Sequence, residues 1–332
     1  MQTTSKFLTC LLTLMAVVLV GCERPPVDST QLGYRGTGMI DVQNPRADMG
    51  EMEFPAALPA ASSDGPKAGE IYQNVQVLGD LSVAEFTRLM TTITAWVSPE
   101  EGCNYCHNPA NLASDDVYTK VVSRRMIQMT QNINAEWSDH VGGAGVNCYT
   151  CHRGNNVPEY IWFAQKDDPS YFIGWRNGQN RPGTDVGYTS MPVDPFSDYL
   201  TEQETASVRV ASSMPFPGDG EAASIADAES TYAMMLNWSQ ALDVNCAYCH
   251  NTASYQDWSI STPQRVTAWH GLQMVRALNA DYLIPLGPEY PDNRLGAHGD
   301  APKAYCATCH QGQKKPLNGA DAVSAYPSLA GQ

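Results

Sequence analysis

The sequence lacks an apolar run long enough to form a membrane-spanning helix. The N-terminal run from Phe7 to Val20 has 14 residues, whereas a helix needs roughly 20 to cross a bilayer. Basic residues are also scarce: 20 lysines and arginines stand against 35 aspartates and glutamates, which gives a formal net charge of −15. This acidic balance, without any basic cluster, gives no support to nucleic-acid binding.

The N-terminus has the features of a secretory signal. Lys6 precedes the apolar run, which ends in Leu19-Val20-Gly21-Cys22. The short run favours a cleaved signal over residues 1–21. The last four residues resemble a bacterial lipobox, which implies membrane lipid attached through Cys22; an uncleaved signal anchor is the alternative. Both place the bulk of the chain outside the cytoplasm.

Residues 22–66 are rich in proline, alanine and glycine and lack helical periodicity. We interpret them as an extended, lipid-anchored arm that runs over the protein surface. Strong period-two alternation is also scarce in the rest of the chain, which argues against a fold built mainly on sheets.

Eight of the ten cysteines occur in four copies of Cys-x-x-Cys-His. This is the attachment motif of c-type haem: two thiols form thioethers with the porphyrin, and the following histidine ligates the iron. Zinc sites or disulfides would leave the histidine after every second cysteine without a role. The sequence therefore predicts four covalently bound haem c groups. Their attachment residues and proximal ligands are Cys103, Cys106 and His107; Cys148, Cys151 and His152; Cys246, Cys249 and His250; and Cys306, Cys309 and His310.

Two stretches of the chain repeat each other. Residues 128–129 and 134–137 match residues 273–274 and 279–282 at an offset of 145. His140 and His298 each lie eight residues before the next attachment cysteine. These offsets predict a two-haem unit used twice. The first unit covers residues 67–156; the second, with a C-terminal tail, covers 224–332; a proline- and glycine-rich connector at 157–223 joins them.

The first unit contains signals for two helices. Ser82 and Glu85 form a capping box before apolar residues at helical spacing, and Pro99 ends that helix. Ser114 and the two following aspartates are expected to open a second helix through Met126 and Met129.

The second unit repeats this pattern. A helix is expected from about residue 227 to 242, and Thr262 with Pro263 starts another. The predicted fold is therefore mainly α: a multihaem cytochrome of two pseudo-symmetric two-haem units, with long connections and an extended N-terminal arm.

The chain has too few histidines to give every haem two of them. Four six-coordinate irons need eight axial ligands, and four of the seven histidines are used as proximal ligands. At least one haem must therefore take another ligand or stay open. Methionine is the expected substitute in an electron carrier, because its thioether sulfur raises the reduction potential. An open site would instead indicate an enzyme.

Methionines on the helices before the haem motifs are the candidate ligands. Met90 precedes His107 by 17 residues, and Met235 precedes His250 by 15. The alternative for each is an ordinary role in filling the core. Met234 points about 100° away from Met235 on a helix and is expected to lie in the core.

For the second haem, Met126 and Met129 compete. Met129 aligns with Met274 in the repeat, so a role common to both units, such as packing, explains that pair. Met126 aligns with Gly271 and is special to the first unit, which makes it the preferred ligand. The fourth haem lacks an equivalent methionine, and its remaining candidates are His140, His270 and His298.

Together, the paired motifs, the lipobox, the helix methionines and a histidine twelve residues before His152 resemble the tetrahaem cytochrome subunit of purple bacterial photosynthetic reaction centres. The resemblance covers the chain from Cys22 to the last haem segment. In that family three haems have histidine and methionine ligands, and the fourth has two histidines. The resemblance implies these ligand pairs: His107 with Met90, His152 with Met126, His250 with Met235, and His310 with His140, for which His298 is the main rival.

The resemblance implies an electron relay and not an enzyme. A soluble periplasmic donor, either a small cytochrome c or a high-potential iron-sulfur protein, would reduce the haems. Electrons would then reach the photooxidised bacteriochlorophyll special pair in the reaction centre core. In the family the haems form a nearly linear row, with the third nearest the special pair and the first most distant. The expected location is the periplasmic face of the inner, photosynthetic membrane.

Glu100 and Glu101, next to the first motif, are candidates for steering a basic cytochrome donor; an iron-sulfur donor would use an apolar patch instead. Two other classes of function compete. A multihaem redox enzyme would need an open iron. A membrane-anchored electron conduit or quinol-linked cytochrome outside photosynthesis would rely on bis-histidine haems, and three spare histidines cannot supply four.

Overall fold

The computed structural model describes most of the chain from residue 54 onward and two short strands of the N-terminal arm. The predicted signal over residues 1–21, the predicted lipid-attachment residue Cys22 and most of the predicted connector lie outside the described residues. The described residues are 28–31, 40–43, 54–165, 191–192, 194–201, 208 and 225–331.

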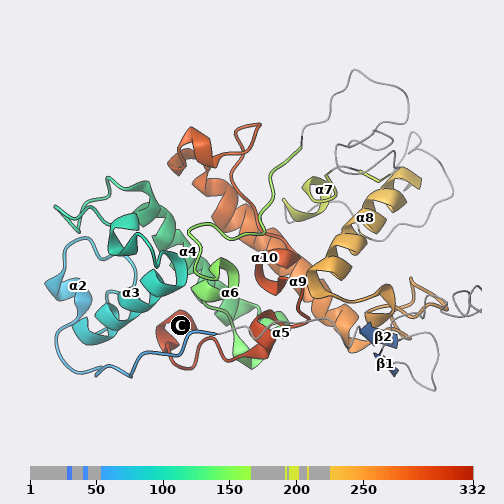
Figure 1. The fold of residues 1–332 in the computed structure, drawn as a ribbon, viewed down its shortest axis with the longest axis horizontal. Helices are drawn as coiled ribbons and strands as arrows, with labels where there is room; N and C mark the ends of the chain where they lie inside the picture. The colour runs from blue at the N-terminus through green and yellow to red at the C-terminus, as the bar shows by residue number, and fades with distance from the viewer. Residues whose placement is uncertain are drawn as a thin grey trace, which may run out of the picture.

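The fold is mainly helical, as predicted, and its long helices come in two pairs (Figure 1). The first half of the molecule contains α3 (Val83–Val97) and α4 (Tyr118–Glu136). The second half contains α8 (Ile225–Leu242) and α9 (Pro263–Ala277). The shorter α-helices are α2 (Ala68–Ile71), α5 (Ser138–Val141), α6 (Cys148–His152), α7 (Ser197–Leu200) and α10 (Cys306–His310).

Short helical turns connect these elements. A π-helical turn, η5 (Leu278–Leu283), continues α9 without a break. The 3-10 turns are η2 (Gly102–Tyr105), η3 (Gly142–Ala144), η4 (Cys246–Tyr248), η6 (Ile284–Glu289), η7 (Asp292–Arg294), η8 (Pro316–Gly319) and η9 (Pro327–Leu329). In the arm, strands β1 (Asp28–Gln31) and β2 (Ile40–Gln43) pair antiparallel, with Asp28 opposite Gln43.

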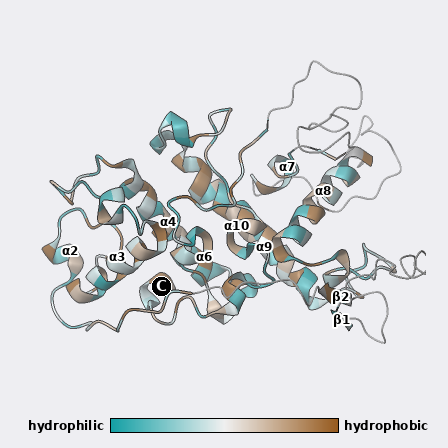
Figure 2. Ribbon diagram, viewed as in Figure 1, coloured by the Kyte–Doolittle hydropathy of each residue, from teal (hydrophilic) through white to brown (hydrophobic). Residues whose placement is uncertain are grey.

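The long helices mix hydrophobic and hydrophilic residues along their length (Figure 2). In the ranges that the structure describes, no helix is both long enough and apolar enough to span a bilayer.

The predicted helix starts are confirmed except for α4. At the start of α3, the Ser82 hydroxyl accepts a hydrogen bond from the Glu85 amide at 3.1 Å, and the Glu85 carboxylate accepts one from the Ser82 amide at 3.0 Å. α9 begins at Pro263, directly after Thr262. The Ser82 cap satisfies an amide that an isolated helix would leave unpaired, whereas Thr262 makes no side-chain cap bond and α9 begins with proline at its first position.

The predicted start of α4 was wrong. The Ser114 hydroxyl accepts a hydrogen bond from the Asp116 amide at 3.1 Å, which closes a separate turn, and the helix begins only at Tyr118. The Asp115 carboxylate forms an ion pair at 2.7 Å with the guanidinium of Arg124, which lies within α4. The polar residues that resemble a cap therefore hold the loop against the side of α4.

The C-terminal end of the chain completes the core of the first half. Leu329, in η9, is fully buried, and Tyr326 is 3% exposed. The Tyr326 ring packs edge-on against Trp96 with 5.1 Å between ring centroids, and its hydroxyl lies 2.9 Å from the Thr92 hydroxyl. The buried residues of this core are Leu89, Trp96, Ile127, Tyr326 and Leu329.

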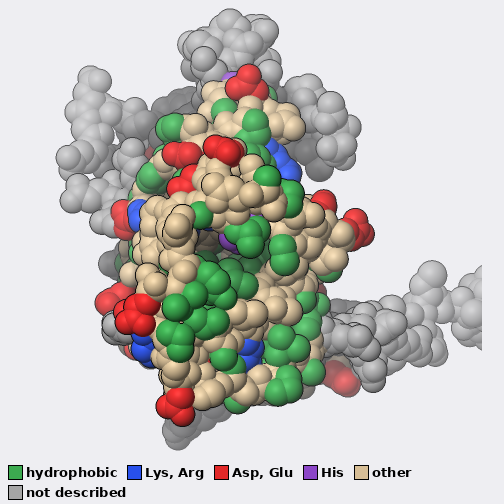
Figure 3. Space-filling model, turned by 90° about the vertical axis from the view of Figure 1, so that its left-hand side faces the viewer, with side chains coloured by type: hydrophobic (Ala, Val, Ile, Leu, Met, Phe, Trp, Pro, Cys, Tyr) green, Lys and Arg blue, Asp and Glu red, His purple; other side chains and the backbone are tan. Residues whose placement is uncertain are grey.

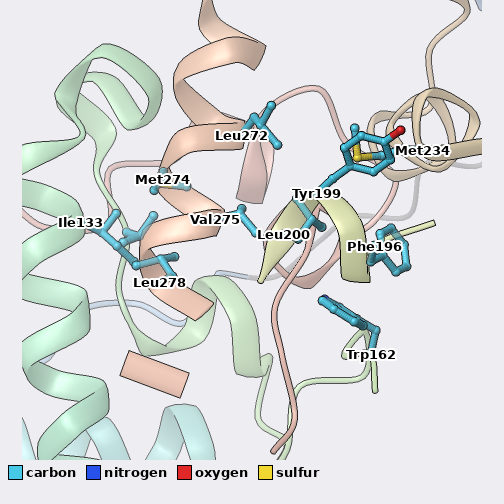
Figure 4. Close-up of a cluster of buried hydrophobic side chains, with 11 residues drawn as sticks. Ile133, Trp162, Phe196, Tyr199, Leu200, Met234, Leu272, Met274, Val275 and Leu278 are labelled. Atoms are coloured by element: carbon cyan, nitrogen blue, oxygen red, sulfur yellow. The ribbon is translucent and has the colours of Figure 1, made fainter. Parts of the chain in front are cut away.

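In the same way, α7 completes the larger core, which consists mainly of residues of the second half and includes Ile133 and Val146 of the first (Figure 4). Leu200 is 1% exposed and faces the buried side of α9, and the Tyr199 hydroxyl lies 2.9 Å from the Thr231 hydroxyl of α8. The buried residues of this core are Ile133, Val146, Trp162, Phe196, Tyr199, Leu200, Met234, Leu272, Met274, Val275 and Leu278.

We call the segments 199–200 and 326–329 the leucine straps. Each strap accepts hydrogen bonds at its backbone carbonyls from two side chains. For residues 326–329 both donors lie on α4; for residues 199–200 one lies on α9 and the other on η5, which continues α9. The four hydrogen bonds run from Gln131 to Ser328 (2.8 Å), Asn134 to Leu329 (2.6 Å), Arg276 to Tyr199 (2.6 Å) and Asn279 to Leu200 (2.7 Å). The donors obey the offset of 145, so the two straps occupy equivalent places.

Asn134 and Asn279 also hold the haem segments. The Asn134 side chain donates to the Val146 carbonyl at 2.9 Å and accepts from the Val146 amide at 2.8 Å. Asn279 makes the same pair of bonds to Ala304, at 3.0 and 2.8 Å. Val146 and Ala304 each lie two residues before an attachment cysteine. One asparagine per half therefore joins the long helix, the leucine strap and the haem segment.

The described parts of the arm contact both halves of the molecule. β2 lies against η4 in the second half, whereas residues 54–62 run along the first half. The contacts include an ion pair of Asp41 with Lys314, the Phe54 ring against Tyr149 at 5.9 Å, the Leu58 amide donating to the Tyr326 hydroxyl at 3.1 Å, and the Ser82 hydroxyl donating to the Ser62 carbonyl at 2.6 Å.

We predict that Leu329→Ala destabilises the first half of the protein, although Leu329 lies at the other end of the chain. Truncating a fully buried leucine costs about 2–5 kcal/mol, and the side chains that lose contact belong to α3 and α4. Hydrogen exchange on the haem-loaded protein should show faster exchange of α3 and α4 amides, with α8 and α9 amides unchanged.

Leu200→Ala is the matched variant and should produce the reverse pattern. Leu236→Ala removes a side chain that is 38% exposed and should change the free energy of unfolding by less than about 0.5 kcal/mol. Equal loss of protection in both halves for either strap variant would contradict the assignment of the straps.

Candidate functional site

Each predicted proximal histidine is oriented by a backbone carbonyl. The carbonyl lies five residues later in the first and third motifs and three residues later in the second and fourth. The four contacts join Nδ1 of His107 to Leu112 (3.1 Å), of His250 to Tyr255 (3.0 Å), of His152 to Asn155 (2.9 Å) and of His310 to Gln313 (2.8 Å). A carbonyl only accepts, so Nδ1 carries the proton and Nε2 keeps the lone pair that a metal needs.

Burial favours the neutral form of these imidazoles. It lowers the pKa of His310 to about 4 and also lowers the pKa values of His152 and His250, because desolvation penalises the charged ring. Burial likewise raises the pKa of the Cys148 and Cys306 thiols to about 12. The residues of the second and fourth motifs are thus held in apolar surroundings, which suit a largely apolar macrocycle.

The first and third motifs share a further contact. The hydroxyl of Thr119 donates to the Tyr105 carbonyl, and that of Thr262 donates to the Tyr248 carbonyl at 2.7 Å. In both cases the threonine stands 14 residues after the tyrosine. The long helix α4 or α9 therefore begins against the haem motif that precedes it.

The second motif lies beside the first. At the end of α6, the Gly154 amide donates to the Trp96 carbonyl of α3 at 2.9 Å. The Asn156 side chain donates to the Glu101 carboxylate at 2.8 Å. α3 leads directly into the first motif, so these bonds join neighbouring haem segments.

The fourth motif follows the second, and the third follows the fourth. The sulfur atoms of Cys151 and Cys309 are 2.9 Å apart, where α6 meets α10. After α10, the Gly312 amide donates to the Ala241 carbonyl of α8 at 2.9 Å, and the Lys314 ammonium lies 5.5 Å from the Tyr248 ring centre. The motifs form one continuous series in the order first, second, fourth, third, which runs from α3 to α8 in Figure 1.

Met234 is completely buried, which confirms its assignment to the core, and Met274 is 6% exposed in the same core. The predicted ligands Met90, Met126 and Met235 are half-buried, and so is Met129. Burial alone therefore does not separate Met126 from Met129.

Met90 is also close to its motif. The Thr94 hydroxyl, one helical turn later, donates to the Met90 carbonyl at 2.9 Å and lies 4.0 Å from the sulfur of Cys103. The methionine and the attachment cysteine are therefore separated by a single turn of α3.

His140 lies opposite His310. Their ring centroids are 6.0 Å apart, with 65° between the ring planes. Two imidazole nitrogens at about 2.0 Å from one metal ion put their ring centres about 6 Å apart. The His140 Nδ1 donates to the Thr267 carbonyl of α9 at 2.9 Å, which leaves its Nε2 for a metal. The residues present therefore fit an iron held between two imidazoles.

The rival histidines face other groups. His270 Nδ1 lies 4.0 Å from the Asp139 carboxylate. His298 is exposed and lines a surface hollow with Trp162 and Phe196.

The end of the molecule at the first motif presents apolar side chains. Ile71 (55% exposed), Tyr72 (42%) and Leu112 (60%) lie there, and the Asn74 amide ties their two segments together through the Ala113 carbonyl at 2.6 Å. Figure 3 shows this end, with apolar side chains gathered around a hollow and acidic side chains scattered about them.

The two predicted docking carboxylates differ. Glu100 is exposed. Glu101 accepts hydrogen bonds from Ser98 at 3.0 Å and from Asn156 at 2.8 Å. Hydrogen bonds from its own backbone amide, Ser98 and Asn156 lower the pKa of Glu101. Glu101 therefore braces the first motif against the second, a role that its position in the sequence does not indicate.

Sequence reasoning missed the residues that support the haem segments. Asn134 and Asn279 stood in the internal repeat, and Thr119 and Thr262 occupy matching places after the first and third motifs. The signal was present, because a polar residue repeated at a fixed offset points to a common contact.

Comparison with known proteins gives the same picture over nearly the whole chain. The family model for the photosynthetic reaction centre cytochrome C subunit matches residues 23–330. The photosynthetic reaction center cytochrome c subunit of Rubrivivax gelatinosus is 50% identical over 319 residues, covering 95% of this chain and 86% of the relative.

Two further relatives carry the same name. The protein of Thermochromatium tepidum is 46% identical over 326 residues, covering 97% of this chain and 80% of its own length. That of Roseobacter denitrificans is 46% identical over 332 residues, covering 95% of this chain and 88% of its own length. With four c-type attachment motifs in one continuous series, this chain belongs to the family of photosynthetic reaction centre cytochrome c subunits.

Proposed function

We propose that this chain relays electrons from a soluble periplasmic donor to the photooxidised bacteriochlorophyll special pair of a reaction centre. The observation that carries the proposal is the continuous series of four attachment motifs. The proposed axial pairs are His107 with Met90, His152 with Met126, His250 with Met235, and His310 with His140. When bound, the four haem c groups supply one-electron redox chemistry.

The protein contributes to this reaction in two ways: it positions the haem groups, and its axial ligands set their reduction potentials. Two cysteines per motif fix each group, and the carbonyl bond to each proximal Nδ1 holds the imidazole in the metal-binding tautomer. Methionine sulfur favours the ferrous state relative to imidazole. The axial ligands therefore favour the lowest reduction potential at the fourth motif, where His310 is paired with a histidine and not with a methionine. This motif is the second to last in the series.

We further propose that the series consists of two pseudo-symmetric two-haem units. The support is repeated chemistry: matching proximal-histidine bonds, matching threonine bonds and matching asparagine bonds in both halves. The proposed units are residues 67–156 and 224–332.

The proposed entry point for electrons is the end at the first motif. The exposed apolar group of Ile71, Tyr72 and Leu112 suits a small, transient interface. Glu100, exposed and three residues before Cys103, adds a negative charge next to the first motif. A small cytochrome c with a basic patch and a high-potential iron-sulfur protein with an apolar patch are therefore both chemically suitable donors.

The proposed exit is the opposite end, at the third motif, facing the reaction centre core. Attachment through lipid on Cys22 would hold the protein at the periplasmic face of the inner membrane, and several acyl chains give stable anchoring where one is marginal. The contacts of Asp41 and Phe54 support an arm that follows the protein surface.

The alternative is a membrane-anchored multihaem conduit or quinol-linked cytochrome outside photosynthesis. The small number of histidines disfavours it, because such carriers rely on bis-histidine ligation and three histidines remain beyond the four proximal ones. A redox enzyme with an open iron is disfavoured by the ring separation of His140 and His310.

Flash-induced absorbance spectroscopy on native membranes tests the relay. We expect a c-type haem to be oxidised within a millisecond of a single excitation of the special pair, and this signal to disappear when the gene is deleted. If the haems remained reduced while the special pair recovered normally, the conduit would replace the relay.

Met90→His should lower the midpoint potential of the first haem. Replacing thioether by imidazole is expected to shift it by on the order of 100 mV, part of the roughly 0.8 V range that axial ligands set. Equilibrium redox titration of the purified protein measures the shift. Met129→Leu, a change at a methionine that packs against the core, is the control; four unchanged potentials in the Met90 variant would remove that ligand from the assignment.

A further inference from the structure

The internal repeat places a glycine where the first half has a proposed methionine ligand. Met126 lies on α4, and Gly271 occupies the corresponding position on α9, at the offset of 145. Glycine inside a helix weakens it relative to alanine. A buried glycine in the middle of α9 therefore requires a reason in the packing.

The reason is the ring of His140. A Cβ atom on Gly271 would stand 2.5 Å from Cε1, 2.8 Å from Nδ1 and 3.0 Å from Nε2 of His140. Carbon atoms do not approach at such distances, so any side chain here displaces the imidazole.

The ring also uses the backbone that Gly271 leaves uncovered. The His140 Nδ1 donates to the Thr267 carbonyl at 2.9 Å. In an α-helix this carbonyl already accepts from the amide four residues later, which is that of Gly271. The carbonyl's second lone pair is reachable only because no Cβ covers that turn.

We infer that Gly271 is the positioning residue that gives the fourth haem site its second histidine: the bare turn of α9 seats the His140 ring opposite His310. This inference rests on the ligand pairs proposed above. A single register position thus decides the ligand class at the second haem motif of each half. Methionine at position 126 supplies a sulfur from its own half, whereas glycine at position 271 admits an imidazole from the other half.

The approach of α5 to α9 supports this geometry. The Asp139 carboxylate and His270 Nδ1 are 4.0 Å apart. Together with the bond from His140 to Thr267, this gives two side-chain contacts between α5 and α9. The ring centroid of His140 lies 6.0 Å from that of His310. His310 is held in turn by the Gln313 carbonyl at 2.8 Å.

Gly271→Ala in the haem-loaded protein tests the inference. We expect complete loss of the bis-imidazole signal in electron paramagnetic resonance of the ferric protein, with the three histidine–methionine signals retained. The potential of the fourth haem should change while the other three stay constant. A purely structural role predicts the opposite, because alanine is the better helix former and would leave the spectrum unchanged.

Gly287→Ala is the matched control. This glycine has no atom within 4 Å of an added Cβ, and its φ is not positive, so all four signals should remain. A bis-imidazole signal that persists in Gly271→Ala overturns the inference.

A second pair of variants tests the register directly. His140→Ala should abolish the bis-imidazole signal, and Gly271→Met in that background should restore a low-spin fourth haem with methionine ligation and a higher potential. Failure of the methionine to ligate would count against the equivalence of positions 126 and 271. A bis-imidazole signal in His140→Ala itself would refute the proposed ligand pair, an outcome separate from any result at Gly271.

Discussion

Among the contacts between the two halves of the molecule, the one that joins their haem motifs lies where α6 meets α10, with the sulfur atoms of Cys151 and Cys309 2.9 Å apart. Each of these helices is little more than one haem motif, so the contact joins two attachment sites directly. The Gln311 side chain adds a hydrogen bond to the Cys151 carbonyl at 3.3 Å. Electron transfer slows steeply with distance, and a connection made through any larger element would have separated the second and fourth sites.

The same contact explains why a sequence order of one to four becomes a spatial order of first, second, fourth and third. Each half places its second motif toward the centre of the molecule and its first motif toward an outer end. When two such halves join through their second motifs, the series is continuous and its outer members are the first and third. The order follows from the way the two halves face each other.

Much of this could be predicted from the sequence, because haem attachment and helix caps leave local patterns. The cysteines, the α3 capping box and the Thr262-Pro263 start are of this kind. The choice between His140 and His298 could not be made from spacing alone. Trp137 lies 11 residues before Cys148, whereas Tyr282 lies 24 before Cys306. The extra residues form η6 and η7 and put His298 on the surface, so equal spacing from the cysteines did not mean equal position.

Long-range packing was equally hidden. The residues around Leu200 and Leu329 in the sequence give no sign of what these side chains pack against. Leu329, near residue 332, fills the core of the first half, and Leu200, which precedes α8, fills the larger core. The prediction of the start of α4 was wrong for a related reason. The Asp115 carboxylate pairs with Arg124, which lies within the helix, and so is not available as a cap.

The C-terminal leucine strap has a consequence for the order in which the protein folds. The core around Trp96 closes only when residues 326–329 pack against α3 and α4. The contact joins residues more than two hundred positions apart, and such non-local contacts form late because a large loop must close first. The first half therefore completes its core late in folding, although its own long helices are close together in the sequence. Its folding is coupled in this way to a segment that follows the fourth motif.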